Sequence, residues 1–263
     1  FRNGKNISIP SSKTHSKNTR QSNRMITFSN KYRSAQTEIM DDLDFQGVEM
    51  KNLLKDLKVV NKWLGGNTIT IDGINKLLQD HSKAEKVTIL DIGCGDGELL
   101  RKCADFGNQN NFNFNCIGLD FNENILTYAK ESSTSYPNIK FRKVDVFLEE
   151  NLIPNCDIAV CTLFLHHFNN KEIEGLLKKL MHKITIGAVI NDLHRNKQAF
   201  NLFKLVSTLF LKTKTAKHDG LVSIARGFKK DELEKISRQI PNQKSKIQWR
   251  WAFRYQWILK KEL

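Results

Sequence analysis

The stretch that most constrains this chain is VTILDIGCGDGELL, at residues 87–100. A short β-branched and apolar run ends at Asp91, glycines follow at 93, 95 and 97, and apolar residues then recur at helical spacing. This order predicts a buried strand, a glycine turn and the start of a helix. Glycines let the backbone approach a ligand closely, and the first amides of a helix point outward without partners. The turn is therefore suited to a polar or anionic ligand.

The spacing of the glycines and the residues that follow them exclude two common nucleotide-binding loops. A dinucleotide fingerprint, G-x-G-x-x-G, needs a glycine at position 98, where a glutamate stands. A P-loop needs Lys-Ser or Lys-Thr after the glycines, and neither follows. What remains is D-I-G-C-G-D-G, with an acid two residues before the first glycine. An ordinary strand-to-helix turn made of small residues is the alternative.

The D-x-G-x-G pattern resembles the first motif of the class I S-adenosylmethionine-dependent methyltransferases. The resemblance implies that Asp91 receives the ammonium of the methionine moiety and that the turn receives its carboxylate. The residues of that turn are Gly93, Cys94, Gly95 and Gly97.

From residue 87 onward, strand and helix patterns alternate. We expect strands at 87–91, 116–120, 139–144, 157–163 and 184–191, and helices at 97–106, 123–132 and 170–182. Alternation of this kind predicts a parallel sheet with helices on both faces and all strand carboxyl ends at one edge. The Asn-rich stretch at 108–115 is expected to be a surface loop.

The C-terminal residues 244–261 show period-two alternation in two aromatic runs, which predicts a pair of antiparallel strands. Aromatic residues interleaved with arginine are also typical of nucleic-acid platforms, which is the alternative. Antiparallel last strands agree with the methyltransferase resemblance. The fold class expected is therefore α/β: a doubly wound, mostly parallel, seven-stranded Rossmann-like sheet with an N-terminal helical cap.

Acidic residues stand at the ends of three successive predicted strands, Asp91, Asp120 and Asp145. A strand-terminal carboxylate can accept hydrogen bonds from both hydroxyls of a ribose. The resemblance implies that Asp120 does so and that Phe121 lies against the adenine. Asp145 is placed to take the adenine amino group, and Val146 and Leu163 complete the expected cofactor set.

The segment after the fourth strand reads CTLFLHHF and lacks the Asn/Asp-Pro-Pro-Tyr motif of enzymes that methylate base amino groups. A Leu-His-His segment is frequent in small-molecule methyltransferases, including a quinone-biosynthesis-like group. One of His166 and His167 is expected to face the pocket, and His167 is a candidate general base. A structural role for both histidines is the alternative.

Two further candidate bases flank an insert at 194–228. His194 and Arg195 leave the fifth strand at its ligand edge, where they could bind a phenolate or carboxylate, and His218 stands in the returning loop KHDG. Between them, residues 199–211 form a helix that is apolar on most of its circumference. Such a helix is expected to be a lid over an apolar substrate, an intersubunit helix or a membrane-surface contact.

The net charge of +14 belongs to the ends of the chain. Residues 1–36 carry eight Lys/Arg and no acid, and 229–263 carry ten Lys/Arg against four acids, so the body is neutral. Residues 1–33 are expected to be a disordered basic tail, because they have few apolar side chains to bury. Residues 34–263 then form one methyltransferase domain, with residues 34–82 as the helical cap.

Five cysteines without a C-x-x-C pair indicate reduced thiols and no metal site. With no secretory signal or membrane-length apolar run, a cytoplasmic location is expected. The function expected is methyl transfer from S-adenosyl-L-methionine to a small, largely apolar acceptor, phenolic, quinone-like or polyketide-like. The alternatives are an RNA methyltransferase that uses the basic tails and a cofactor-binding protein without catalysis. A small-molecule acceptor is the expected partner; nucleic acid is not expected, and peripheral membrane contact and oligomeric state stay open.

Overall fold

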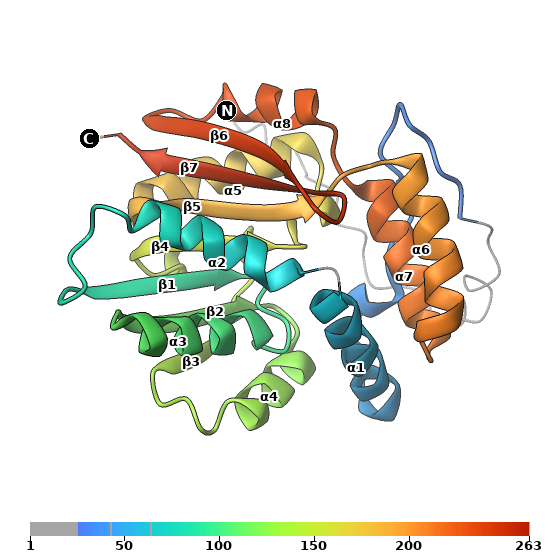
Figure 1. The fold of residues 1–263 in the computed structure, drawn as a ribbon, viewed down its shortest axis with the longest axis horizontal. Helices are drawn as coiled ribbons and strands as arrows, with labels where there is room; N and C mark the ends of the chain where they lie inside the picture. The colour runs from blue at the N-terminus through green and yellow to red at the C-terminus, as the bar shows by residue number, and fades with distance from the viewer. Residues whose placement is uncertain (1–25, 43, 64, 263) are drawn as a thin grey trace, which may run out of the picture.

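The computed structural model describes residues 26–42, 44–63 and 65–262, and its centre is one seven-stranded sheet (Figure 1). The strand order is β3-β2-β1-β4-β5-β7-β6. Strands β1 to β5 pair in parallel, and β7 runs antiparallel to both β5 and β6. The predicted fold class is confirmed. The strands are β1 (Lys86–Ile92), β2 (Asn113–Asp120), β3 (Ile139–Lys143), β4 (Cys156–Thr162), β5 (Ile184–Leu193), β6 (Gln243–Arg250) and β7 (Arg254–Lys261).

Helices cover both faces of the sheet. One apolar layer joins α2 and α3 to the sheet, and a second layer joins α5 and α8 to the opposite face. The α-helices are α1 (Gly47–Trp63), α2 (Gly66–Leu77), α3 (Glu98–Asn110), α4 (Glu123–Ser132), α5 (Asn170–Lys183), α6 (Lys197–Phe210), α7 (Lys214–Arg226) and α8 (Lys230–Ser237). Short 3-10 helices are η2 (Ile39–Asp41), η3 (Glu150–Leu152) and η4 (Leu165–His167). Among the described residues, every helix is too short or too polar to cross a bilayer.

Helix α2, expected as part of the cap, belongs to the layer on the sheet. Its residues Ile74 and Leu77 are buried in the same cluster as Val189 of β5. At Gly73 a Cβ atom would lie 2.5 Å from the Val189 side chain, so a glycine is required for this close packing. The part of 34–82 that stands away from the sheet is η2 and α1.

The Asn-rich stretch is not a surface loop, contrary to expectation. Helix α3 continues to Asn110 and β2 begins at Asn113, so only two residues connect them. The rings of Phe106, Phe112 and Phe114 stack on one another beside the sheet, and Phe114 is buried. These aromatic side chains bury enough apolar area to order the stretch despite its asparagines.

The expected tail must be divided in two. Residues 1–25 lie outside the described residues, whereas the expectation is wrong for residues 26–33. Ile26 and Phe28 pack against Ala199 and Phe200 of α6. Arg33 donates hydrogen bonds to the carbonyl oxygens of Arg226 (2.8 Å) and His166 (2.8 Å).

From Arg33 the chain continues as an extended strap, residues 34–42, across the carboxyl ends of the strands. Helices α6 and α7 stand side by side at the same end of the molecule (Figure 1). The strap, α1 and this helix pair surround the edge of the sheet where β1, β2 and β4 end. That edge, where the strand order reverses, is where α/β sheets of this kind bind ligands.

Candidate active site

The glycine turn after β1 is tied to the neighbouring strand. The backbone amides of Gly93 and Cys94 both donate to the Leu119 carbonyl of β2, at 2.9 and 3.0 Å. Gly93 has a φ of +70°, and a Cβ there would lie 2.1 Å from the Phe164 ring. Gly95 has a φ of +53° and no atom within 4 Å of its Cβ direction, so it leaves open space above the turn. Position 93 therefore admits only glycine, and position 95 strongly favours it.

Asp120, at the end of β2, braces this turn. Its Oδ2 accepts a hydrogen bond from the Gly95 amide (3.0 Å), and its Oδ1 accepts one from the Asn122 amide (3.0 Å). Burial raises the pKa of the Asp120 carboxyl, although these amides act against that rise. The Asp120 carboxylate lines a cavity at this edge of the sheet, where each of its oxygens keeps a lone pair for a further hydrogen-bond donor.

Asp91 is buried without a counter-ion. Among the described residues, none donates a hydrogen bond to its carboxylate, although its side chain is enclosed and borders a cavity. Burial, together with the nearby carboxylates of Asp120 and Asp96, raises its pKa well above the usual value. The nearby cations, Lys58 and Arg101, pair with Asp96 instead. An ammonium group beside Asp91 would restore the ionised form, which is the fit expected for an amino-acid ligand.

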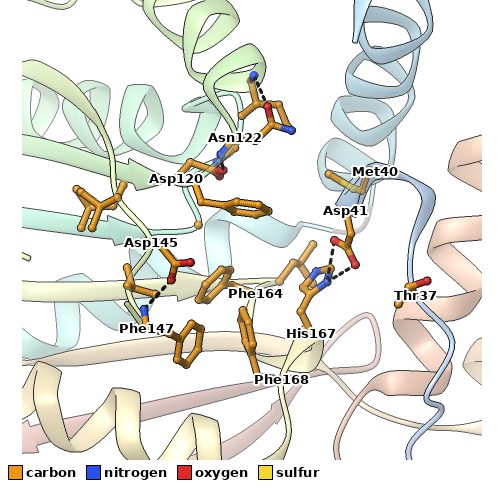
Figure 2. A pocket seen from close by; sticks show the side chains of 18 of the residues that line it. Thr37, Met40, Asp41, Asp120, Asn122, Asp145, Phe147, Phe164, His167 and Phe168 are labelled. Carbon is orange, nitrogen blue, oxygen red and sulfur yellow. Dashed lines mark hydrogen bonds and ion pairs between the residues drawn. The ribbon is translucent and has the colours of Figure 1, made fainter. Parts of the chain in front are cut away.

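The described residues line two cavities at this edge of the sheet. The larger, which we call the main cavity, has a volume of about 370 Å³ and opens beside Asp120 (Figure 2). Aromatic rings form much of its wall, and a smaller cavity of about 180 Å³ extends toward Asp91. Gly93, Gly95, Leu163 and His167 line both spaces. The aromatic residues of the wall are Phe121, Phe147, Phe164 and Phe168.

The structure brings most of the predicted cofactor residues to these cavities. Asp145 and Val146 line the main cavity, and the Oδ1 of Asp145 accepts hydrogen bonds from the amides of Phe147 and Leu148. Leu163 has a φ of +53°, an unusual conformation for a non-glycine residue, in the turn that leads to η4.

Two of the predicted cofactor residues, Gly97 and Cys94, have structural roles in the turn. Gly97 lines neither cavity; it caps α3 in the left-handed conformation, and a Cβ there would meet the Phe141 ring at 2.6 Å. Cys94 borders the smaller cavity, but its thiol is buried against Gly118.

His167 is the predicted base that the structure brings to the cavity. Its Nδ1 lies 3.1 Å from Oδ1 of Asp41, an acid of the N-terminal strap that the sequence did not single out (Figure 2). Its Nε2 lies 4.0 Å from Oε1 of Glu38, also on the strap. A carboxylate at Nδ1 favours the tautomer that leaves Nε2 free to accept a proton.

His166 is buried directly behind His167. Its Nδ1 lies 2.7 Å from Oδ1 of Asp192, and its Nε2 lies 3.2 Å from Oε1 of Glu38. Burial alone would lower the pKa of His166, but Asp192 and Glu38 outweigh it and raise the pKa to about 9. His166 is therefore a buried imidazolium that holds the strap to the sheet.

His194 and His218 line neither cavity. The His194 ring packs on Tyr255, and burial together with Lys229 and Arg195 lowers its pKa to about 4. His218 pairs with Asp219 (2.9 Å), whose carboxylate accepts the backbone amides of Ile39 and Met40 and so fixes the strap.

Arg195 does not reach the cavities either, because it forms an ion pair with Glu232 at 2.8 Å. A strand-end position alone did not show which way these side chains turn.

Glu38, His166 and His167 place three metal-ligating atoms within 4.8 Å of one another. Both ring nitrogens of His166, however, already face carboxylate oxygens at hydrogen-bond distance. That arrangement satisfies a protonated ring, so a proton competes directly with any metal ion for the site.

Comparisons with known proteins agree with this geometry. Residues 89–186 match the family model described as a methyltransferase domain. The protein 235L of Invertebrate iridescent virus 6, named as a methyltransferase, is 24% identical over 163 residues, or 60% of this chain. Phosphoethanolamine N-methyltransferase 3 of Arabidopsis thaliana is 27% identical over 108 residues, or 40% of this chain. The matches cover 49% and 21% of those relatives, so the chain spans half of their length or less.

Solved structures share the fold. The plantazolicin methyltransferase BpumL in complex with SAH superimposes with a TM-score of 0.61 at 15% identity, covering 80% of this chain and 90% of that one. The magnesium protoporphyrin IX methyltransferase ChlM from Synechocystis PCC 6803 with bound SAH gives a TM-score of 0.51 at 17% identity, covering 88% and 90%. With the family match at its glycine turn and sheet, the chain carries a class I S-adenosylmethionine-dependent methyltransferase domain.

Proposed function

We propose that the protein transfers the methyl group of S-adenosyl-L-methionine to a hydroxyl of a small, largely apolar acceptor. The cofactor supplies a methyl group already activated on a sulfonium. Asp91 would hold its ammonium, the glycine turn its carboxylate, and Asp120 the ribose hydroxyls. Phe121, Asp145, Val146 and Leu163 would surround its adenine. The unpaired, buried Asp91 beside the open turn is the fit that supports this assignment.

The proposed role in deprotonating the acceptor is supported by the His167–Asp41 pair, in which His167 lines both cavities. We infer that Nε2 of His167 takes the proton from the acceptor hydroxyl. The hydroxyl oxygen would then displace the methyl group from the sulfonium, whose carbon–sulfur bond would break to leave the neutral thioether S-adenosylhomocysteine. The proton leaves the O–H bond for the imidazole, and Asp41 stabilises the imidazolium that forms. His is suited to this step because its ordinary pKa lies near neutrality.

The lining of the cavity favours an apolar acceptor. Apart from the residues assigned to the cofactor, its apolar lining includes Phe147, Phe164, Phe168, Met40 and Ile125. Binding in such a cavity is most favourable for a ligand with an aromatic or aliphatic surface, because both apolar surfaces are then removed from water. The relatives whose names state their acceptors act on phosphoethanolamine, plantazolicin and magnesium protoporphyrin IX, which are all small molecules.

Calorimetry and a transfer assay test the two halves of the proposal separately. S-adenosylmethionine is expected to bind, and Asp120→Ala to weaken it by about 1–3 kcal/mol through lost charge-assisted hydrogen bonds. With radiolabelled cofactor and a panel of phenols and quinols, His167→Ala is expected to lower turnover by roughly 10²–10⁴ with unchanged cofactor affinity. His182→Ala, on the exposed side of α5, is the matched control. Full turnover in His167→Ala would show that His167 is not the general base. Binding of a nicotinamide dinucleotide in place of S-adenosylmethionine would contradict the cofactor assignment.

A further inference from the structure

Helix α6 has a second apolar face that no described residue covers. Its buried side, with Ala199, Phe200 and Phe203, packs with α7 and with Ile26 and Phe28. On another side, four apolar residues at positions i, i+3, i+4 and i+7 are exposed to solvent, and two of them, Leu205 and Leu209, are 64% and 73% exposed. The four are Leu202, Leu205, Val206 and Leu209, and we call them the α6 face.

The α6 face is not part of the acceptor site. No residue of α6 lines either cavity, so the helix is not a lid over the space described above. A contiguous exposed apolar stripe on a single helix usually marks a contact surface.

The sequence segment that contains α6 carries basic residues and no acid. Between Asp192 and Asp219 the sequence has no Asp or Glu, whereas five lysines flank or interrupt α6. Four of them, Lys197, Lys204, Lys212 and Lys214, are exposed. Exposed leucines bordered by lysines are the pattern of a helix that lies in the interface of an anionic membrane.

Two further observations bear on this surface. The sequence of residues 1–25 has six basic residues and no acid, and it precedes Ile26, which packs against α6. Trp251, 65% exposed where β6 turns into β7, contacts Phe253, which packs in the same cluster as Phe200. Tryptophan is favoured at membrane interfaces because its ring is apolar and its N–H polar.

We propose that the α6 face docks this protein on an anionic membrane surface. The leucines enter the boundary between headgroups and acyl chains, and the lysines contact the lipid phosphates. A second copy of the chain suits this face less well, since a two-fold contact would bring the same lysines together. Where the proposed function holds, docking also brings the cavity, which α7 lines through Arg226, near apolar acceptors dissolved in the bilayer.

Vesicle co-sedimentation without cofactor tests the docking independently of methyl transfer. The protein is expected to bind vesicles that contain phosphatidylglycerol, to bind vesicles of phosphatidylcholine alone much less, and to be released by salt. The double variant Leu205→Glu/Leu209→Glu should reduce binding roughly tenfold or more, since it removes apolar insertion and adds negative charge. Leu148→Glu/Leu152→Glu alters two comparably exposed leucines elsewhere and should bind like wild type.

Three results would overturn the proposal. The first is no binding to anionic vesicles, and the second is equal loss of binding in both double variants. The third is loss of binding on deletion of residues 1–25 with undiminished binding in the α6 variant, which would assign the contact to the tail alone. If light scattering instead shows a wild-type dimer that the α6 variant dissociates, without vesicle binding, then the face is an interface between copies. Unchanged melting temperatures in both double variants show that any loss is not due to unfolding.

Discussion

The buried imidazolium of His166 predicts a stability effect that depends on pH with a defined sign. Asp192 and Glu38 raise the pKa of this ring from its usual 6.5 to about 9. A histidine whose pKa is raised on folding stabilises the fold fully below the unfolded pKa, and the stabilisation is lost as pH rises through the folded pKa. A rise of this size corresponds to about 3 kcal/mol. His167 and His166 lower the pKa of Glu38, although burial acts in the opposite direction. Glu38 therefore stabilises the fold at pH values above its usual pKa.

The perturbation we choose is Glu38→Gln, which keeps the shape and removes one of the two carboxylates. Of the two contacts of His166, the one to Glu38 is longer, 3.2 Å against 2.7 Å to Asp192. Glutamine keeps an oxygen for Ser223, which donates to Oε1 of Glu38 at 2.7 Å. We therefore expect a loss of about 1–2 kcal/mol near pH 6–7, with the pKa of His166 lower by about one.

The assay is urea unfolding of wild type and variant from pH 6 to pH 10, with the pKa of His166 followed by NMR. The difference in unfolding free energy should shrink as pH rises through 9 and vanish or reverse by about pH 10. The five buried thiols, present in both proteins, cancel in this difference. Glu85→Gln removes the partner of the partly exposed His81 and should cost less than about 1 kcal/mol. A difference equal at pH 6 and pH 10, or a wild-type midpoint near 6.5, would refute the buried imidazolium.

Further predictions concern His194, metal binding and the N-terminal residues. His194→Ala is expected to keep turnover within about twofold, because His194 lines neither cavity. Because the pKa of His194 is lowered to about 4, the wild-type protein should lose stability as pH falls from 6.5 toward 4. The melting temperature of His194→Gln should fall less over the same pH range. Dialysis against a chelator should leave cofactor affinity and melting temperature unchanged, because both ring nitrogens of His166 already face carboxylate oxygens at hydrogen-bond distance; a loss restored by a divalent metal would contradict this. Deleting residues 1–25 should leave the melting temperature nearly unchanged, whereas deleting residues 1–33 should lower it by several degrees, because Phe28 and Arg33 pack against the domain.

The sheet and the cofactor edge could be predicted from the sequence because their signals are local. Strand, glycine turn and helix follow one another within fourteen residues. The glycine spacing excluded a dinucleotide loop, and the absence of a following Lys-Ser or Lys-Thr excluded a P-loop. Asp91, Asp120 and Asp145 come together because parallel strands end at the same edge, which the alternation of elements already implied.

What the tertiary structure alone decided depends on contacts between distant residues. Glu38 and Asp41 reach the histidines across about half of the chain, and no local pattern marks a strap that becomes ordered by such pairing. His167 and His194 both follow strands at the ligand edge, yet His167 lines the cavities, whereas the His194 ring packs on Tyr255 and lines neither. The Asn-rich stretch is ordered, contrary to its local propensity, because Phe112 and Phe114 pack against Phe106 of α3. Sequence spacing fixes which backbone atoms meet, whereas the direction of each side chain is set by the neighbours that packing supplies.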